Sequence, residues 1–363
     1  MKKSLYFLFV ACLATSCRHQ KEGKNIFHSY SIETAVTDTL YGKIICTGKA
    51  GETYDEIDFC DPFLILCRHH SDTSLHVFRY ANKIIQSAFI INQTTLQMPS
   101  PHLCQHNSMA NKHEITIWDN TLHQWTTLNL QQGKLTTPFT FLPRYYSYPH
   151  PIYIPDCNNL FIFEHSIYAT DIAGTGSPLS LFYRYDYAKE ECSFIPPYAP
   201  MVGNTPRNQS LFYTQLAIHE KKNSIVAAPR FFNSLSFFNL DGTPCKVITY
   251  GENFQRPVTD TIRGFVDRIN SPKYFLAIQS TEQYVYCLYD GTPSMKAPSR
   301  ILVFEWDGTH VASWQTDRNL YTFAVDPTNS YLLALAPNEK EGQDILLYPL
   351  RFQNKRNQKQ INE

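Results

Sequence analysis

Two stretches of the chain carry histidine and cysteine side chains at spacings that suit a metal ion. His102, Cys104 and His106 alternate, so an extended strand would point all three the same way, and imidazole and thiolate are zinc ligands. No fourth ligand is identifiable, and an ordinary loop gives the same spacing. His69 and His70 form a second pair, which is typical of a solvated turn. We therefore predict no cofactor and keep His102, Cys104 and His106 as weak candidates for metal ligands.

Four carboxylates are the next group that could do chemistry. Asp55, Glu56, Asp58 and Asp61 lie within seven positions of one another. Such a group could bind calcium or supply the two carboxylates of a glycoside hydrolase. The alternation of apolar and polar residues over 57–61 favours a simpler interpretation, in which the group marks an exposed strand edge and its turn.

The most distinctive polar and aromatic stretch covers residues 144–151. Its candidate ligand-binding side chains are Arg144, Tyr145, Tyr146, Tyr148 and His150. Aromatic rings beside a cation and an imidazole suit stacking against a sugar or a peptide, and the prolines would stiffen the loop and lower the entropic cost of binding. The alternative is an aromatic strand packed between two sheets.

The catalytic motifs of the large enzyme families are absent from the sequence. There is no G-x-S-x-G, no H-E-x-x-H and no phosphate-binding G-x-x-x-x-G-K-[ST]. The sequence therefore favours a protein without catalysis, and it names no catalytic residue.

The N-terminus has the pattern of an export signal. A positive start is followed by an apolar run over residues 5–14, and Ala14, Thr15 and Ser16 lead directly into Cys17. Small residues before a cysteine resemble the bacterial lipobox, in which the cysteine becomes the lipidated first residue. We predict a signal peptide over residues 1–16 and a lipid on Cys17. The alternative is an ordinary secretory signal that is cut elsewhere.

The residues that follow suit a tether. Residues 18–35 are polar and lack periodicity, so we predict a lipidated cysteine and flexible tether over 17–35. Only Glu22 is acidic among residues 18–24, which favours an outer-membrane lipoprotein that faces the periplasm of a Gram-negative bacterium.

Composition excludes several classes of protein. The 32 basic residues equal the 32 acidic ones, which argues against a nucleic-acid partner. The longest apolar run, residues 5–12, is much shorter than the ~18 residues of a membrane span. The 24 Phe and 23 Tyr residues provide too much apolar surface for a disordered chain.

A repeat organises the rest of the chain. Period-two alternation extends from about residue 38 to 350 and favours β-strands. Six copies of a similar strand occur at residues 74–80, 114–119, 180–185, 234–240, 300–306 and 344–350. All copies except the last are followed by another strand, and most are preceded by a strand, a polar turn and an apolar strand.

These units predict an all-β, six-bladed β-propeller with four-stranded blades over residues 36–350. The polar tail, residues 351–363, cannot supply the fourth strand of the last blade. Residues 38–46 form a strand-like stretch without a blade of its own. We therefore expect this N-terminal strand to complete the last blade and close the ring, which removes two open sheet edges. Two separate β-sandwiches are the alternative.

The repeat and the lipobox together resemble the TolB-like six-bladed β-propeller lipoproteins. The likeness is strongest over residues 211–350, in QYVYCLY (283–289), ILVFEWDG (301–308) and FAVDPTN (323–329). Residues 98–107 lack the glycines that members often have there. The resemblance implies a propeller fold and a lipoprotein, and it supplies no catalytic residue, because fold alone does not define function.

Our functional hypothesis is a lipid-anchored propeller of the cell envelope that binds a protein or another ligand without catalysis. Its expected partners are the membrane, through the lipid on Cys17, and an envelope protein or glycan. The alternative is a propeller enzyme that acts on glycans or lactone-like substrates at the channel mouth. That alternative requires carboxylate or histidine side chains that converge there.

Overall fold

A computed structural model describes residues 28–352 except 33–34, 70, 82–83, 105–112, 120–121, 123, 137–138, 141–156, 164–165, 172–179, 187–188, 190, 199–200, 202–208 and 261–264. Within these residues no helix has both the length and the apolar character of a membrane span.

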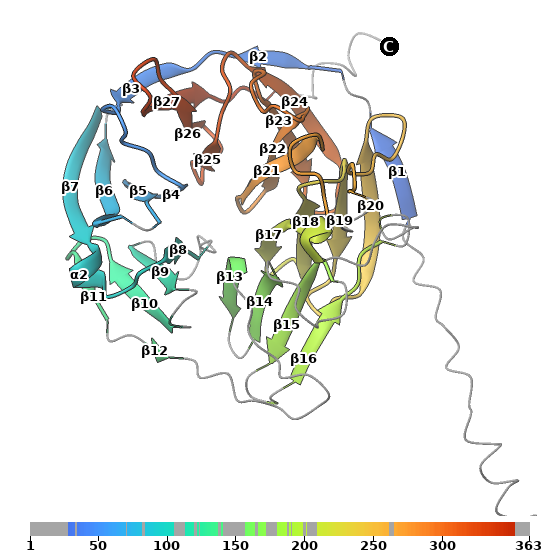
Figure 1. The fold of residues 1–363 in the computed structure, drawn as a ribbon, viewed down its shortest axis with the longest axis horizontal. Helices are drawn as coiled ribbons and strands as arrows, with labels where there is room; N and C mark the ends of the chain where they lie inside the picture. Colours follow the sequence, from blue (N-terminus) through green and yellow to red (C-terminus); the bar gives the residue numbers. More distant parts are fainter. Residues whose placement is uncertain are drawn as a thin grey trace, which may run out of the picture.

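Six small, mainly antiparallel sheets are arranged in a ring and form a six-bladed β-propeller (Figure 1). Blade 1 consists of β4 (Glu56–Cys60), β5 (Phe63–Cys67), β6 (Thr73–Ala81) and β7 (Ile84–Asn92). Blade 2 consists of β8 (Pro101–Leu103), β9 (Glu114–Asp119), β10 (Gln124–Asn129), β11 (Lys134–Leu135) and β12 (Phe139–Thr140). Blade 3 consists of β13 (Cys157–Phe163), β14 (Ser166–Asp171), β15 (Phe182–Asp186) and β16 (Glu191–Ile195).

The second half of the chain forms the other three blades. Blade 4 consists of β17 (Thr214–His219), β18 (Ser224–Pro229), β19 (Ser234–Phe238) and β20 (Pro244–Tyr250). Blade 5 consists of β21 (Lys273–Ser280), β22 (Tyr284–Thr292), β23 (Arg300–Glu305) and β24 (His310–Thr316). Blade 6 begins with β25 (Thr322–Val325), β26 (Tyr331–Pro337) and β27 (Gln343–Pro349). Two single turns of helix, α2 (Gln93–Leu96) and η1 (Gln209–Phe212), lie in the connections.

The six predicted copies of the repeat are all strands of separate blades. In five blades the copy is the third strand from the centre, as the strand–turn–strand unit before it requires. In blade 2 the copy is β9, the second strand, and the short β8 is the innermost. This shift follows from the sequence, because residues 101–103 supply one short strand where the other blades supply two before the copy.

The cores of the molecule lie between neighbouring blades, because each sheet buries both of its faces. Alternation along β4 sends Ile57 and Phe59 towards blade 6, where they join Leu333 and Leu335 of β26. Cys60 instead joins Leu103 of blade 2. The same alternation therefore decides which residues of the innermost strands face a neighbouring blade.

The predicted ring closure is confirmed. Strand β3 (Lys43–Thr47) pairs antiparallel with β27 and becomes the fourth strand of blade 6. Gly48 extends the ladder, since its N–H donates to the Gln343 carbonyl oxygen at 2.9 Å. The closing strand is shorter than the predicted stretch of residues 38–46, because Asp38–Leu40 forms a separate strand.

That separate strand belongs to a longer feature, which we call the N-terminal belt and define as β1, β2 and β3. Strand β1 (His28–Ile32) lies parallel to β20 as a fifth strand of blade 4, and β2 (Asp38–Leu40) lies parallel to β24 of blade 5. Figure 1 shows the belt in blue along the outer rim of three consecutive blades. The structure thus assigns to a sheet five residues, 28–32, that the sequence predicts to be part of the tether.

Candidate functional site

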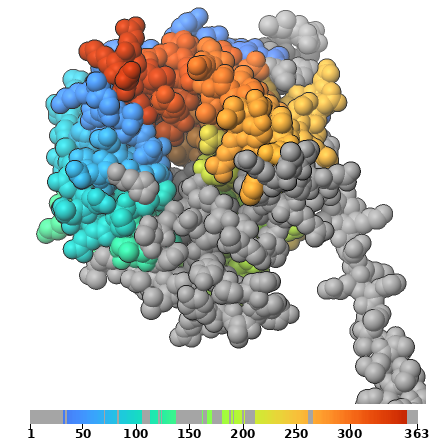
Figure 2. Space-filling view, in the orientation of Figure 1, coloured from blue at the N-terminus to red at the C-terminus, as the bar shows by residue number. Residues whose placement is uncertain are grey.

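A cavity of about 590 Å³ lies at the centre of the ring. Its walls come from innermost strands or their ends in blades 1, 2, 4, 5 and 6, including Glu56, Leu103, Gln215, Ile278 and Thr322. Figure 2 shows the surface hollowed between blade 1 in blue and blades 5 and 6 in orange and red. Its volume is in the range of pockets that hold small ligands, about 300–1,000 Å³.

On the blade 1 side, strand alternation presents a carboxylate to blade 2. Ile57 and Phe59 pack towards blade 6, so Glu56 faces the opposite way, towards β8. The Leu103 backbone N–H of β8 donates to Glu56 Oε2 at 2.6 Å. The innermost strands of two blades therefore hold this carboxylate at the cavity wall.

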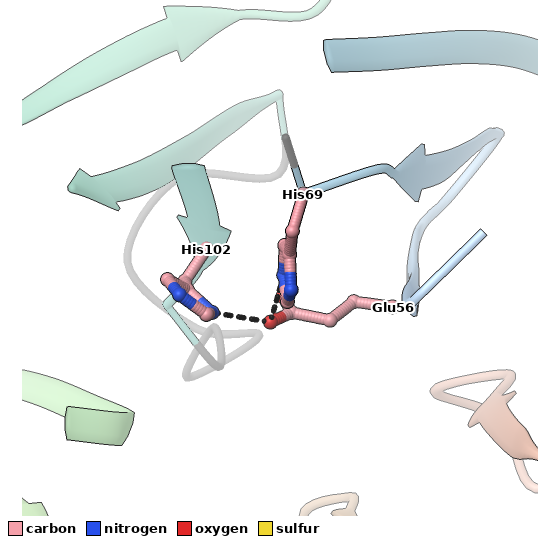
Figure 3. A group of neighbouring side chains, drawn as sticks. All are labelled: Glu56, His69 and His102. Carbon is pink, nitrogen blue, oxygen red and sulfur yellow. Dashed lines mark hydrogen bonds and ion pairs between the residues drawn. The ribbon is translucent and has the colours of Figure 1, made fainter. Parts of the chain in front are cut away.

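Two histidines converge on the other oxygen of the same carboxylate (Figure 3). His69 Nε2 lies 2.9 Å from Glu56 Oε1, and His102 Nδ1 lies 2.8 Å from it. His69 is close because Glu56 pairs with Cys67 in the ladder, which brings the turn after β5 beside the start of β4. His102 reaches Glu56 from β8. The centres of the two imidazole rings are 4.0 Å apart.

The electrostatics of the cluster favour an ionised carboxylate. Burial alone would raise the pKa of Glu56, but the hydrogen bonds and charges of His102 and His69 outweigh it and lower the pKa to about 2. Burial alone would lower the pKa of His69, but the Glu56 hydrogen bond and the charges of Glu56 and Asp55 hold it above its ordinary value. Glu56 is therefore an anion at neutral pH and is not available as a general acid.

A cation stands on the blade 4 side of the cavity. Arg230, which follows β18, lies over the ring of Tyr213 with 5.5 Å between its guanidinium carbon and the ring centre. One guanidinium nitrogen lies 3.5 Å from Met295 Sδ, a weak acceptor. Arg230 has no carboxylate partner in the part of the chain that the structure describes. One wall of the cavity therefore carries carboxylate and imidazole groups, and another carries an arginine without a carboxylate partner among the described residues.

Several predicted site residues lie outside the described residues. These are Cys17 and His106, together with Arg144, Tyr145, Tyr146, Tyr148 and His150. The lipidation site and the aromatic ligand-binding stretch consequently remain predictions.

The histidine and cysteine candidates that can be located do not act together. His102 contacts Glu56 and His69, whereas Cys104 packs beside Trp118 in the apolar cluster between blades 2 and 3. His69 was predicted to lie in a solvated turn. It does lie in a turn, but its side chain is only 22% exposed and is bonded to Glu56. The turn is as predicted, but His69 is only partly solvated because its ring packs against His102 of the neighbouring blade.

The four acidic residues do not form one cluster, although Asp55, Glu56 and Asp58 all line the cavity. Asp61 is exposed in the turn after β4, and Asp55 accepts the His69 backbone N–H at 2.7 Å, so the edge-and-turn interpretation describes both. Glu56 departs from it. In the described part of the chain, one group of three metal-ligating side chains converges, and it joins Glu56 to His69 and His102 rather than to the other carboxylates.

No single sequence signal predicts this cluster. Its members come from two blades, and Glu56 and His102 are 46 residues apart in the chain. Each residue is notable within its own motif. Their combination depends on which strand of blade 2 is innermost, and blade 2 is the one that departs from the repeat.

Comparison with known proteins identifies the fold class. No family model matches the chain, and no curated protein matches it. A Bacteroides fragilis crystal structure, described as a presumed exported protein, is 12% identical, with a TM-score of 0.54 over 91% of this chain and all of that one. A member of the DUF4221 family from Bacteroides vulgatus is 13% identical, with a TM-score of 0.53 over 86% of this chain and 99% of that one. At this identity the likeness shows the shared fold.

Proposed function

We propose that the protein is an exported, lipid-anchored β-propeller that binds an acidic sugar in its central cavity. The observation that carries the proposal is Arg230, a cation at the cavity wall without a carboxylate partner among the described residues. A planar guanidinium matches a carboxylate in shape and charge. An acidic sugar would bring that carboxylate together with hydroxyl groups.

The rest of the cavity suits the hydroxyl groups and the ring of such a ligand. Gln215, Gln279 and Asn319 offer amide donors and acceptors, and Asp55 and Asp58 offer acceptors. Tyr213 adds an aromatic surface of the kind on which sugar rings stack. Together these groups could form hydrogen bonds with several hydroxyl groups of one bound sugar.

Export and anchoring rest on the N-terminal pattern. The apolar segment and the small residues before Cys17 support a lipoprotein signal, and the two similar structures come from Bacteroides, one of them described as presumed exported. The TolB-like resemblance supports the same interpretation. The ten residues 18–27 between Cys17 and β1 span at most about 35 Å. A lipid on Cys17 would therefore keep the rim of blade 4 close to the membrane.

D-glucuronate is the probe for the cavity, and D-glucose is its uncharged control. In titration calorimetry we expect glucuronate to bind at least ten times more tightly than glucose, because a charge-assisted hydrogen bond contributes about 1.5–3 kcal/mol. Arg230→Ala should weaken glucuronate binding by about 10- to 100-fold, and Arg79→Ala, an exposed arginine of β6, should leave it unchanged. Equal binding of glucuronate by the wild type and by Arg230→Ala would refute the proposal.

The anchor has its own test. Mass spectrometry of the protein from its native membrane should find a diacylglycerol-modified cysteine at the new N-terminus, and Cys17→Ser should release the protein from the membrane. An unmodified N-terminus at another position would favour the ordinary secretory signal.

A catalytic role is the second candidate, and the Glu56 cluster specifically favours it. Histidine and carboxylate side chains do converge at the cavity, as an enzyme acting on glycans or lactones requires. Glu56 would then act as a nucleophile, because its low pKa excludes the acid role and makes it a weak base. Hydrolysis of nitrophenyl glycosides and of simple lactones by the wild type, abolished in Glu56→Gln, would support this candidate.

A further inference from the structure

The Glu56 cluster has a geometry close to that of a metal-binding site. His69 Nε2 and His102 Nδ1 approach one oxygen, Glu56 Oε1, at 2.9 and 2.8 Å, and the three potential ligand atoms all lie within 4.8 Å of one another. Ligand atoms about 2.0–2.1 Å from a tetrahedral zinc ion are about 3.3 Å apart. Each histidine–carboxylate distance therefore needs to increase by only about 0.5 Å to admit the ion.

The same nitrogens that contact the carboxylate could bind an ion. Two imidazole rings with centres 4.0 Å apart both direct a nitrogen at a single carboxylate oxygen. Without an ion, each neutral ring can donate one N–H to that oxygen. A dication bound by the two deprotonated nitrogens and the carboxylate would replace both of these hydrogen bonds, with release of the protons.

Surrounding groups hold the ligands in position. The Leu103 N–H fixes Glu56 Oε2 at 2.6 Å, which leaves Oε1 for the ion. Asp55 accepts the His69 backbone N–H, and its Oδ2 lies 3.9 Å from His69 Nδ1, the nitrogen that faces away from Glu56. At 3.9 Å the carboxylate makes no hydrogen bond with the ring, but its negative charge behind His69 favours a cation on the other side.

We propose that Glu56, His69 and His102 bind a divalent first-row transition metal ion, represented here by Zn²⁺, with an open coordination position towards the central cavity. Two imidazoles and one carboxylate are ligands that Zn²⁺ accepts, and three protein ligands leave a position for water or a bound molecule. Glu56 and His69 line the cavity, so that position is accessible. The proposal goes beyond sugar binding and does not depend on it.

The first experiment uses the full-length protein and the metal alone. After dialysis against a chelator, titration with Zn²⁺ in competition with a chromogenic chelator should give one tight site per chain. Co²⁺ should produce the visible absorption of a four- or five-coordinate ion without the ultraviolet charge-transfer band of a thiolate ligand, because no cysteine belongs to the cluster. A folded wild type that binds no Zn²⁺, or a Co²⁺ spectrum dominated by thiolate, would overturn the proposal.

Substitution tests the ligand set. His69→Gln and His102→Gln should each weaken Zn²⁺ binding by at least about 100-fold, since even groups behind the ligands contribute about 10- to 100-fold. His76→Gln is the matched control, because His76 lies in the same blade and contacts Tyr54 and Ser87 instead of Glu56. Equal Zn²⁺ affinity of His69→Gln, His76→Gln and the wild type would overturn the proposal.

A measurement on the wild type covers the case in which the variants do not fold. Diethyl pyrocarbonate modifies accessible imidazoles, and mass spectrometry locates the modified residues. His69 lines the cavity and its side chain is 22% exposed, so Zn²⁺ should protect it while leaving His76 unchanged. Equal modification of His69 with and without Zn²⁺ would contradict the proposed ligand set. Since no sugar is used, a negative glucuronate titration and a negative zinc titration refute separate proposals.

Discussion

The two halves of the ring are built from similar blades but differ at their outer edges. Blades 4, 5 and 6 carry the N-terminal belt, so β20, β24 and β27 each pair with a strand from the start of the chain. The outermost strands of blades 1, 2 and 3 pair with no belt strand in the part of the chain that the structure describes. The Glu56 cluster lies in blades 1 and 2, so the closure of the ring and the candidate metal site occupy opposite halves.

This separation has a physical consequence. A sheet edge that is paired on the outside is protected from other chains and from fraying, and blade 6 could not be completed without the belt. The site needs the innermost strands β4 and β8 and the turn after β5, whose positions are set by packing within and between blades 1 and 2. We therefore expect changes in the belt to affect stability strongly, while changes in the cluster affect metal binding more than folding.

The largest effect is expected from removing the closure. Deletion of residues 36–48 removes β2 and β3, leaves the edge of β27 unpaired and takes away the core contacts of Ile45 and Cys46. Because most domains are stable by only about 5–15 kcal/mol, we expect the deletion variant to lose its cooperative thermal transition in circular dichroism. Deletion of residues 353–363, most of the predicted polar tail (residues 351–363), is the control. A belt deletion that melts like the wild type would show that the belt does not stabilise its half of the ring.

The next largest loss of stability is expected at a buried ion pair in blades 4–6, the half of the ring that carries the belt. Arg318 donates to Asp344 at 3.0 Å, and the Asp344 side chain is only 6% exposed. Arg318→Ala would leave that carboxylate without its cation and should lower the free energy of unfolding by about 2–3 kcal/mol.

The matched pair in the other half is Arg184 and Asp186 of blade 3. These two groups are 3.8 Å apart, and Lys189 lies 3.4 Å from the same carboxylate. Arg184→Ala should therefore lower the free energy of unfolding by no more than about 1 kcal/mol in urea denaturation. Equal losses for the two variants would show that the halves do not differ in this respect.

A smaller effect tests the fit between the belt and blade 6. A methyl group on Gly48 would lie 2.2 Å from the Gln343 backbone oxygen, so Gly48→Ala must push the two strands apart. We expect a loss of about 2–3 kcal/mol, as for other overpacked sites. Gly51→Ala is the control, since Gly51 has φ of +72° but no atom within 4 Å of the added methyl, and it should lose about 1 kcal/mol. A Gly51→Ala loss equal to that of Gly48→Ala would remove the steric explanation.

The smallest effect is expected from the titration of His219 between blades 4 and 5. Burial lowers its pKa, and its ring packs edge-on against Trp306 at 5.0 Å. Because the folded state disfavours the proton, this contribution to stability is complete above the ordinary pKa of about 6.5 and is lost as the pH falls below it. Urea midpoints at pH 7.5 and 5.5 should differ less in His219→Gln than in the wild type. An unchanged pH dependence would exclude His219 as a source.

Much of the fold could be predicted because each blade has a local pattern. Alternation and turns mark the strands of the repeat, and the polar tail after residue 350 leaves a gap in blade 6 that only the N-terminal strand can fill. The strand β1 could not be predicted in the same way, nor could the pairing of β2 with blade 5 instead of blade 6. Three to five residues added in parallel to the outside of a finished blade have little local signal.

The residues 56, 69 and 102 were each visible in the sequence as part of a short motif, and the sequence by itself determined the strands of the repeat, the number of blades and the closure of the ring. Only the tertiary structure decided which of these residues lie together. Glu56 contacts His69 and His102, whereas Cys104 packs in a different cluster from His102. The physical reason is that the pattern of a strand is local, because it depends only on which side chains of that strand are buried. A cluster between blades depends instead on how one sheet is positioned against the next.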